Sequence, residues 1–246
     1  MADTPNFGFN PKPRFSVNHL TRYLSTTNAS QRHAIIREAK FPRKIPVATY
    51  GQAKRDIQNF LSKGGTDIAS LNASLDRLAA KAVREPDKRD EALRCIKALE
   101  AFKELYATKR WSKITFSPNS VDIPHRIGGV LINIRLDAQM YERHDDGSTT
   151  TGGVVIFLAQ TAEARKQIDV RRRQVASLVL WGLEGYSQME PLPRLCLSFD
   201  VFGQECVRAP DAKDRFRRDV LASCREAAIG WDGIAPPDGY DGPPWL

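Results

Sequence analysis

Apolar side chains recur every three or four residues through the N-terminal half of the chain, which is the spacing of amphipathic helices. Between residues 16 and 41 this spacing predicts two short helices. Ser16 can cap the first helix, and Asn28 or Ser30 can cap the second, because these side chains accept hydrogen bonds from the free N–H groups of a first turn. The same periodicity predicts three further helices, at residues 49–65, 67–84 and 87–109.

After Trp111 the pattern changes to alternating and continuously apolar runs, which predict β-strands. The Asp-Asp-Gly sequence at 145–147 is a turn signal between two of these runs and predicts a β-hairpin. Residues 152–161 are almost continuously apolar, as in a central strand that is buried on both faces. The remaining predicted elements are a helix at 161–186, a strand pair at 194–210 and a last helix that Asp211 caps.

These elements predict an α+β or α/β fold class, with an all-helical N-terminal half followed by a mixed β-sheet core with flanking helices. Residues near both ends are rich in proline and glycine and lack a hydrophobic period, which is typical of extended or mobile segments. The predicted organisation is a flexible arm at 1–15, a helical domain at 16–86, an α/β core at 87–233 and a Pro/Gly-rich tail at 234–246.

The composition of the chain also indicates where in the cell the protein is expected to lie. The chain has no apolar run near the ~20 residues that span a bilayer, and its N-terminus lacks the apolar region of a secretory signal. Its four cysteines are far apart and form no C-x-x-C pair, which favours reduced thiols over a zinc site or a disulfide framework. Together these features predict a cytoplasmic protein that does not bind a membrane.

The chain is basic, with a formal net charge of +8 and an isoelectric point near 9.4. Such a surface attracts polyanions, of which nucleic acid is the most common partner, although a net charge alone does not establish one. Common catalytic motifs are absent: there is no G-x-x-x-x-G-K-[ST], G-x-G-x-x-G, G-x-S-x-G or H-E-x-x-H sequence, and the four histidines lack a companion at ligand spacing.

An aspartate, Asp137, lies on the first strand of the predicted hairpin, and Gln174 lies early in the helix that follows. The order of helix, strands, hairpin, helix and strand pair over residues 87–210 resembles the core of the PD-(D/E)XK nuclease superfamily, particularly its helicase-associated bacterial branch. The resemblance implies a restriction-endonuclease-like fold in which Asp137 and Gln174 match the aspartate and glutamine of a metal site. The sequence departs from the family at the acid-x-lysine pair, where it has Gly153 and Val155.

The loss of the acid-x-lysine pair determines whether metal-dependent cleavage of a phosphate is expected. A single carboxylate at Asp137 would hold Mg²⁺ or Mn²⁺ poorly, because these ions favour an octahedral oxygen shell. Without a lysine at position 155, no cation on that strand stabilises the charge that develops on a phosphate. A migrated acid such as Glu142, Asp145 or Asp200 would restore a metal site. The simpler alternatives are a water-facing edge-strand carboxylate at Asp137 and a β-bulge or close backbone approach at Gly152-Gly153.

Two basic segments are candidates for contact with phosphates. The helix pair at 16–41 resembles a helix-turn-helix in length, although two short helices are common in any helical bundle. The second segment opens the helix at 161–186, where cations oppose the helix dipole; they bind phosphate or pair with neighbouring acids such as Asp169. The predicted nucleic-acid-binding residues are Arg32, Arg37, Lys40, Arg43, Lys44, Arg165, Lys166, Arg171, Arg172 and Arg173.

The sequence therefore favours a protein with a nuclease-like core that binds nucleic acid, DNA rather than RNA, without cutting it and without a cofactor. A role in bacterial defence or in a mobile element is expected from the resemblance alone. One alternative is a scaffold protein, whose Tyr240 and Trp245 dock on a partner protein or fold back on the body. The other alternative is an active nuclease with a rearranged site that uses Mg²⁺ or Mn²⁺.

Overall fold

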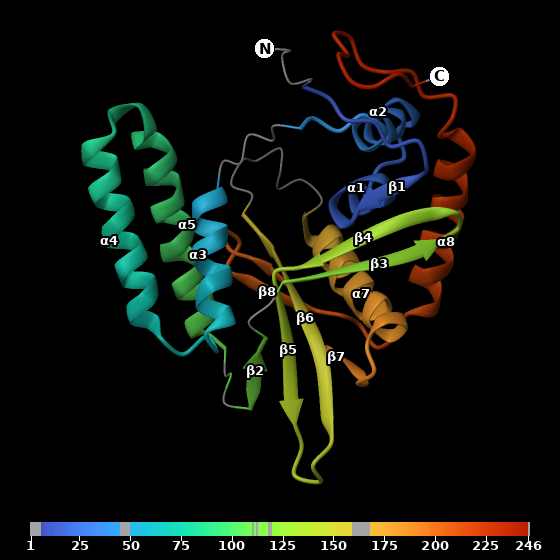
Figure 1. Ribbon diagram of the computed structural model, residues 1–246. Helices are drawn as coiled ribbons and strands as arrows, with labels where there is room; N and C mark the ends of the chain where they lie inside the picture. The colour runs from blue at the N-terminus through green and yellow to red at the C-terminus, as the bar shows by residue number, and fades with distance from the viewer. Residues whose placement is uncertain are drawn as a thin grey trace. The chain divides into compact units, whose positions relative to one another are not determined.

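The computed structural model describes residues 6–44, 50–109, 111, 113–117, 120–158 and 168–245. It confirms the predicted fold class, since N-terminal helices are followed by mixed β-sheets with flanking helices (Figure 1). The chain divides into two compact units. Unit 1 draws on residues 1–47, 122–134 and 211–246, and unit 2 draws on residues 48–121 and 135–210.

Unit 1 combines the first two helices and the last helix with a three-stranded sheet of order β1-β4-β3, in which β1 and β4 are parallel. The predicted caps are confirmed, because the Ser16 side chain accepts the N–H of His19 and the Asn28 side chain accepts the N–H of Gln31. The elements of this unit are β1 (Arg14–Ser16), α1 (Val17–Leu24), α2 (Ala29–Lys40), β3 (Val121–Ile127), β4 (Val130–Leu136) and α8 (Asp214–Gly230).

The helix α8 begins later along the chain than the sequence predicts. Lys213 rather than Asp211 is its N-cap residue, and no side chain caps it. The β3–β4 turn packs on this helix through Gly128, whose φ is +54°. A Cβ at Gly128 would lie 3.0 Å from the carbonyl oxygen of Leu221, so both the backbone conformation and the close approach favour glycine here.

Unit 2 has a five-stranded sheet of order β2-β5-β6-β7-β8, in which only β6 and β7 are parallel. The chain passes from β6 to β7 through α7, as a parallel connection requires. The elements are α3 (Gly51–Ser62), α4 (Ile68–Arg84), the 3₁₀ turn η1 (Pro86–Lys88), α5 (Arg89–Ala107), β2 (Ile114–Phe116), β5 (Ala138–Arg143), β6 (Thr149–Phe157), α7 (Ile168–Tyr186), β7 (Pro191–Asp200) and β8 (Glu205–Arg208).

The predicted hairpin is the β5–β6 pair, and the central strand β6 is buried along almost its whole length. The bulge predicted at Gly152-Gly153 is confirmed by a shift in the register of β6 against β7 between Thr151 and Gly153. A Cβ at Gly152 would lie 2.2 Å from the carbonyl oxygen of Leu195, and one at Gly153 would lie 2.7 Å from a methyl carbon of Leu136. The backbone therefore approaches closely at both glycines.

The core of unit 2 lies between the sheet and a layer of three adjacent helices, α3, α4 and α5 (Figure 1). Phe102 of α5 contacts Phe199 of β7 with ring centroids 6.4 Å apart, so the helix that the sequence predicts at 87–109 packs on the sheet. Alternate β7 residues such as Ser198 and Asp200 point to the opposite face, where Arg172 of α7 contacts Asp200. Helices thus cover both faces of this sheet.

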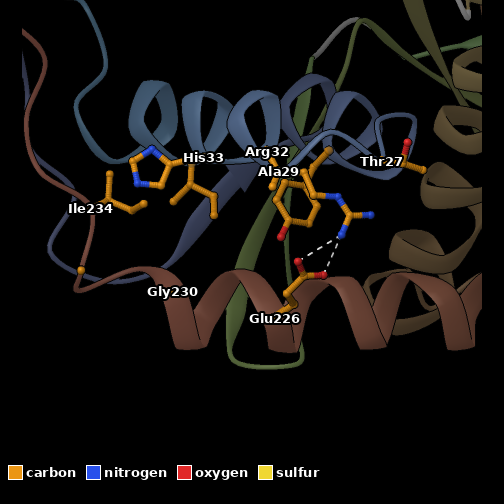
Figure 2. A pocket seen from close by; sticks show the side chains of 10 residues that line it. Thr27, Ala29, Arg32, His33, Glu226, Gly230 and Ile234 are labelled. Atoms are coloured by element: carbon orange, nitrogen blue, oxygen red, sulfur yellow. Dashed lines mark hydrogen bonds and ion pairs between the residues drawn. The ribbon is translucent and has the colours of Figure 1, made fainter.

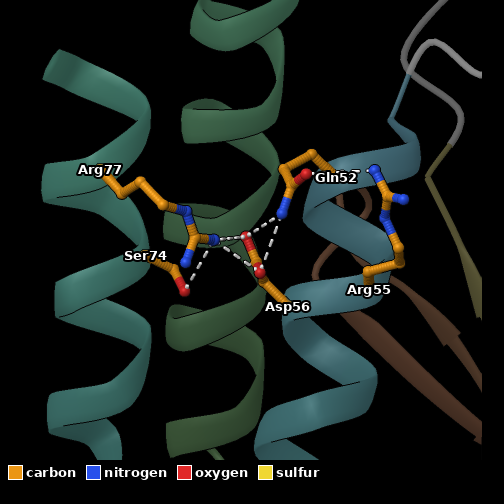
Figure 3. A network of polar contacts seen from close by, with 5 residues as sticks. All are labelled: Gln52, Arg55, Asp56, Ser74 and Arg77. Carbon is orange, nitrogen blue, oxygen red and sulfur yellow. Dashed lines mark hydrogen bonds and ion pairs between the residues drawn. The ribbon is translucent and has the colours of Figure 1, made fainter. Parts of the chain in front are cut away.

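A polar network joins α3 to α4 (Figure 3). Arg77 of α4 donates to both carboxylate oxygens of Asp56 on α3, at 2.7 and 2.8 Å, and to the hydroxyl of Ser74 at 3.4 Å. Gln52 donates to the same carboxylate at 3.1 Å. The Asp56 side chain is only 6% exposed, so these donors compensate a nearly buried charge.

All four cysteines are free thiols, in agreement with their spacing in the sequence. Among the helices that the structure describes, none is long and apolar enough to cross a membrane.

Candidate nucleic-acid interface

Helix α2 of unit 1 buries one face and exposes the other. Ile35, Ile36 and Ala39 are buried on the inner face. Exposed side chains along the outer face include Ser30, His33, Ala34 and Glu38. Helix α2 therefore has an open face, which is one of the features that a helix-turn-helix requires.

Arg32 lies at the edge of that face and is held by α8 (Figure 2). Its guanidinium donates to both carboxylate oxygens of Glu226, at 2.8 and 3.0 Å, and its Nε donates to the carbonyl of Thr26. The guanidinium also lies 4.9 Å from the ring centre of Tyr23. Burial and the nearby Glu226 carboxylate raise the pKa of Tyr23 to about 12, so the phenol keeps its proton at neutral pH. Arg32 is mainly a structural link between α2 and α8.

A cavity of about 540 Å³ lies at this link, lined by Tyr23, Arg32, His33, Glu226 and Ile234, among other residues (Figure 2). Because Arg32 and Glu226 neutralise each other there, the cavity has no net charge from this pair and offers no evident preference for an anion.

Lys40 is buried, with an exposed fraction of 3%. Its ammonium donates to the carbonyl oxygens of Trp231, Asp232 and Ile234 at 2.9, 3.2 and 3.0 Å. Burial lowers the pKa of Lys40, and Asp232 opposes that shift. Lys40 therefore does not lie on the surface with the other cations that the sequence groups with it.

The remaining predicted cations of unit 1 are Arg37, which is half-buried, and Arg43 and Lys44, which are exposed. Within the part of the chain that the structure describes, no acidic side chain pairs with any of the three. Backbone hydrogen bonds fix the segment that carries them, since the N–H of Gly8 donates to Pro42 and the N–H of Lys44 donates to Asn6, each at 2.8 Å.

The segment of residues 6–44 carries a large excess of positive charge. Residues 6–44 contain eight lysines and arginines but a single acid, Glu38, which forms a two-point ion pair with Arg22. The chain as a whole carries a net charge of +8, so most of its excess positive charge resides in this short stretch.

The arginines of α7, in unit 2, have three different environments. Arg172 is 3% exposed and pairs with Asp169, with Asp200 at 2.9 Å and with Glu205 at 2.9 Å. Arg173 is exposed, and Arg171 is half-buried with a polar partner. Arg172 is thus enclosed by acids rather than free for phosphate. The predicted Arg165 and Lys166 lie outside the described residues.

Asp137 lies at a bend between β4 and β5, not on the first hairpin strand as the sequence predicts. Its carboxylate accepts the N–H of Ile156 at 2.7 Å, the amide of Gln58 at 2.8 Å and the ammonium of Lys54 at 2.9 Å. The alternative of a water-facing carboxylate is wrong, because the Asp137 side chain is 0% exposed. No sequence pattern pointed to Lys54 and Gln58, which come from a helix some 80 residues earlier.

Two of the three acids that the sequence offers to complete a metal site are engaged in ion pairs with arginines. Glu142 pairs with Arg194, Asp200 pairs with Arg172, and Asp145 is exposed in the hairpin turn. Within the described residues, no group of three or more His, Cys, Asp or Glu side chains is placed to hold a metal ion. Gln174 is half-buried on α7 and has a polar partner.

The C-terminal tail folds back on unit 1, which is one of the two outcomes that the sequence left open. The Tyr240 ring packs against Phe41 with centroids 5.0 Å apart, and the Trp245 ring packs against the same residue at 6.3 Å. The Asp241 carboxylate accepts the N–H groups of Asn6 and Phe7. These contacts occupy the rings that would otherwise dock on a partner protein.

Comparisons with known proteins add no relative to this geometry. No model of a protein family matches the chain, and no curated protein matches it in sequence. What the residues support is a mixed α/β fold with N-terminal helices and a central mixed sheet, carrying a basic, partly open helix in unit 1.

Proposed function

We propose that this protein binds nucleic acid through the exposed face of α2 and the adjoining segment 41–44. The observation that carries the proposal is the charge of residues 6–44, eight cations to one acid, together with the absence of acidic partners for Arg37, Arg43 and Lys44 in the described structure. Cations that remain unpaired on a surface are free to replace the counterions of a phosphate backbone.

DNA is favoured over RNA as the partner. The outer face of α2 carries small side chains, Ser30 and Ala34, beside the cations, so the helix can approach closely. The major groove of B-form DNA admits an α-helix, whereas the major groove of A-form RNA is too narrow for one.

The proposal is tested by fluorescence anisotropy with a labelled duplex of about 20 base pairs over a series of salt concentrations. Three phosphate contacts would give a slope of about −2.7 in log K against log salt, at about −0.9 for each contact. The triple variant Arg37→Gln, Arg43→Gln, Lys44→Gln should bind at least ten times more weakly and should show a slope near zero.

The matched control removes the same charge from unit 2, through Arg84→Gln, Arg89→Gln and Lys97→Gln, all of which are exposed. It should retain the affinity of the unchanged protein within about threefold, because long-range attraction is screened over about 10 Å at 0.1 M salt. Equal losses in the two triple variants would show that only net charge matters, and would overturn the assignment to α2.

The proposal also covers unit 2, as a nuclease-like core that does not cleave, in a cytoplasmic protein without a cofactor. Its support is the enclosure of Asp137 by donors from Lys54, Gln58 and Ile156, which occupy both of its carboxylate oxygens. Plasmid DNA incubated with Mg²⁺ or Mn²⁺ should stay intact. Metal-dependent fragments that disappear in the Asp137→Asn variant would overturn this part.

A further inference from the structure

Unit 1 contains a second cavity beside α2, of about 520 Å³. It lies between the C-terminal half of α2, the segment that follows it, and Phe7 of the N-terminal segment. Small-molecule sites commonly have volumes of about 300–1,000 Å³, so the cavity is large enough for a mononucleotide. The lining residues that matter for recognition are Phe7, His19, Ala34, Arg37, Phe41 and Arg43.

Two arginines line this cavity, and neither has an acidic partner in the described structure. The Nε of Arg37 is enclosed and lacks any hydrogen-bond acceptor among the described residues. No acidic side chain and no Nε acceptor among the described residues therefore competes with a ligand anion for the Arg37 guanidinium, which lines the cavity. Glu38 also lines the cavity, but its charge is already compensated by the two-point ion pair with Arg22.

The aromatic walls are fixed in place before any ligand arrives. Phe7 packs against Tyr240 with ring centroids 5.8 Å apart, and the guanidinium of Arg43 lies 5.7 Å from the Phe7 ring centre. Phe41 stacks on Phe9 at 5.6 Å. An arginine beside a rigid aromatic ring is suited to a ligand that combines an anion with a flat ring, because the cation takes the anion and the ring stacks.

His19 offers a further donor. The hydroxyl of Ser16 lies 3.0 Å from Nδ1 of His19 and accepts the backbone N–H of the same residue. In the tautomer in which this hydroxyl donates to Nδ1, the ring proton of a neutral imidazole lies on Nε2. That N–H can donate to a ligand oxygen in the cavity.

We propose that this cavity binds a nucleotide, with the phosphate on Arg37 and Arg43 and the base against Phe7. The nucleotide is either free or the terminal nucleotide of a strand that carries a 5′-phosphate. The second source rests on the proposed nucleic-acid function, whereas the first does not.

The experiment measures binding of AMP, adenosine and inorganic phosphate by titration calorimetry on the full chain. AMP should bind at least ten times more tightly than either fragment, because only AMP engages both the arginines and the ring. The Arg37→Gln substitution should weaken the binding of AMP at least tenfold. The control substitution Arg218→Gln removes an exposed arginine of α8 that does not line the cavity, and should leave the affinity for AMP unchanged.

A second pair of variants separates cavity filling from loss of charge. Ala34→Phe places a ring in the cavity and should abolish AMP binding. Ala222→Phe adds the same ring to an exposed alanine of α8 that does not line the cavity, and should leave AMP binding unchanged. Circular dichroism of both variants checks that the helices remain folded.

Single strands of about 12 nucleotides with a 5′-phosphate or a 5′-hydroxyl distinguish the two sources. A phosphate-dependent affinity that Ala34→Phe removes would identify the strand end, and AMP binding without such a preference would identify the free nucleotide. Failure of AMP to bind, together with equal affinity for both ends, would overturn the cavity proposal while duplex binding could stand. AMP binding by a protein that ignores the duplex would overturn the proposed function instead.

Discussion

The ammonium of Lys40 lies 2.9 Å from the carbonyl oxygen of Trp231, the residue that ends α8. Lys40 is itself the last residue of α2, so one side chain joins the ends of two helices that lie 191 residues apart in the sequence. The carbonyl end of a helix carries partial negative charge and unsatisfied acceptors, and a buried ammonium satisfies both.

Replacing Lys40 with methionine should therefore lower the free energy of unfolding by about 3 kcal/mol, because three carbonyl oxygens lose a charged donor. Urea denaturation followed by circular dichroism gives the value. The control is Lys44→Met, an exposed lysine whose replacement should change stability by no more than about 0.5 kcal/mol. Equal stability of the two variants would show that the carbonyl contacts contribute nothing net.

His19 should make the stability of unit 1 sensitive to acid. Burial, and then the charge of Arg22, lower the pKa of His19 below its ordinary value of 6.5, while Glu38 opposes the shift. The unfolded chain takes up a proton near pH 6.5, before the folded chain does, so the free energy of unfolding should decrease as the pH falls from 6.5 towards the lowered pKa. More than about one unit above pH 6.5 both states of this residue are neutral, and it contributes no pH dependence.

Urea denaturation at several pH values between about 7.5 and 5 measures that decrease. The His19→Gln variant should lose the part of the slope that this residue causes, while it keeps a hydrogen-bonding side chain near Ser16. A slope that is identical in the two proteins would assign the acid sensitivity to other groups.

The sequence predicted the local structure well, because local structure depends on local chemistry. The caps at Ser16 and Asn28 and the turn at 145–147 were each identified from a few neighbouring residues. The prediction that Asp211 caps the last helix is wrong, because the helix begins only at Asp214. Several side chains can open a helix, and the choice among them depends on packing.

The environments of charged residues were not predicted, because their partners are remote. Lys40 meets Trp231, and Asp137 meets Gln58 from 79 residues away. A run of basic residues such as 171–173 gives no sign that its middle member is buried, since the acids that enclose Arg172 include Asp200 on another element. The sequence therefore identified a basic region correctly but could not separate surface cations from structural ones.

The bulge at Gly152 gives a direct test of the sheet. Replacement by alanine would put a Cβ 2.2 Å from the carbonyl oxygen of Leu195, where neither backbone can move without breaking the β6–β7 register. We expect Gly152→Ala to destabilise the protein by about 3 kcal/mol or more, at the upper end of the cost of overpacking. Thermal unfolding with circular dichroism measures the loss.

Gly230→Ala is the matched control, since nothing lies within 4 Å of a Cβ at this helical position. It should be neutral or stabilise by up to about 1 kcal/mol, because alanine favours helices over glycine. If Gly152→Ala unfolds at the same temperature as Gly230→Ala, the strands are not as closely packed at the bulge as the structure has them.

Arg172 and Arg173 are neighbours with opposite expected roles. Arg172→Met leaves Asp200 buried without its cation, and should lower the free energy of unfolding by about 3–5 kcal/mol. Arg173→Gln, on an exposed side chain, should change it by less than about 0.5 kcal/mol. Denaturation in urea ranks the two variants, and the reverse order would contradict the buried ion-pair network.

The double variant Arg172→Met, Asp200→Asn tests the reason for that loss. An asparagine side chain carries no charge, yet its oxygen can still accept the N–H of Gly203, which the Asp200 carboxylate accepts at 3.0 Å. The double variant should therefore recover part of the stability that Arg172→Met loses. The control combines Arg172→Met with Asp211→Asn, which removes the charge of an exposed aspartate, and it should recover none of that stability. Equal recovery in both would mean that overall charge, rather than the buried Asp200 carboxylate, sets the cost, and it would return Arg172 to the set of cations available for phosphate.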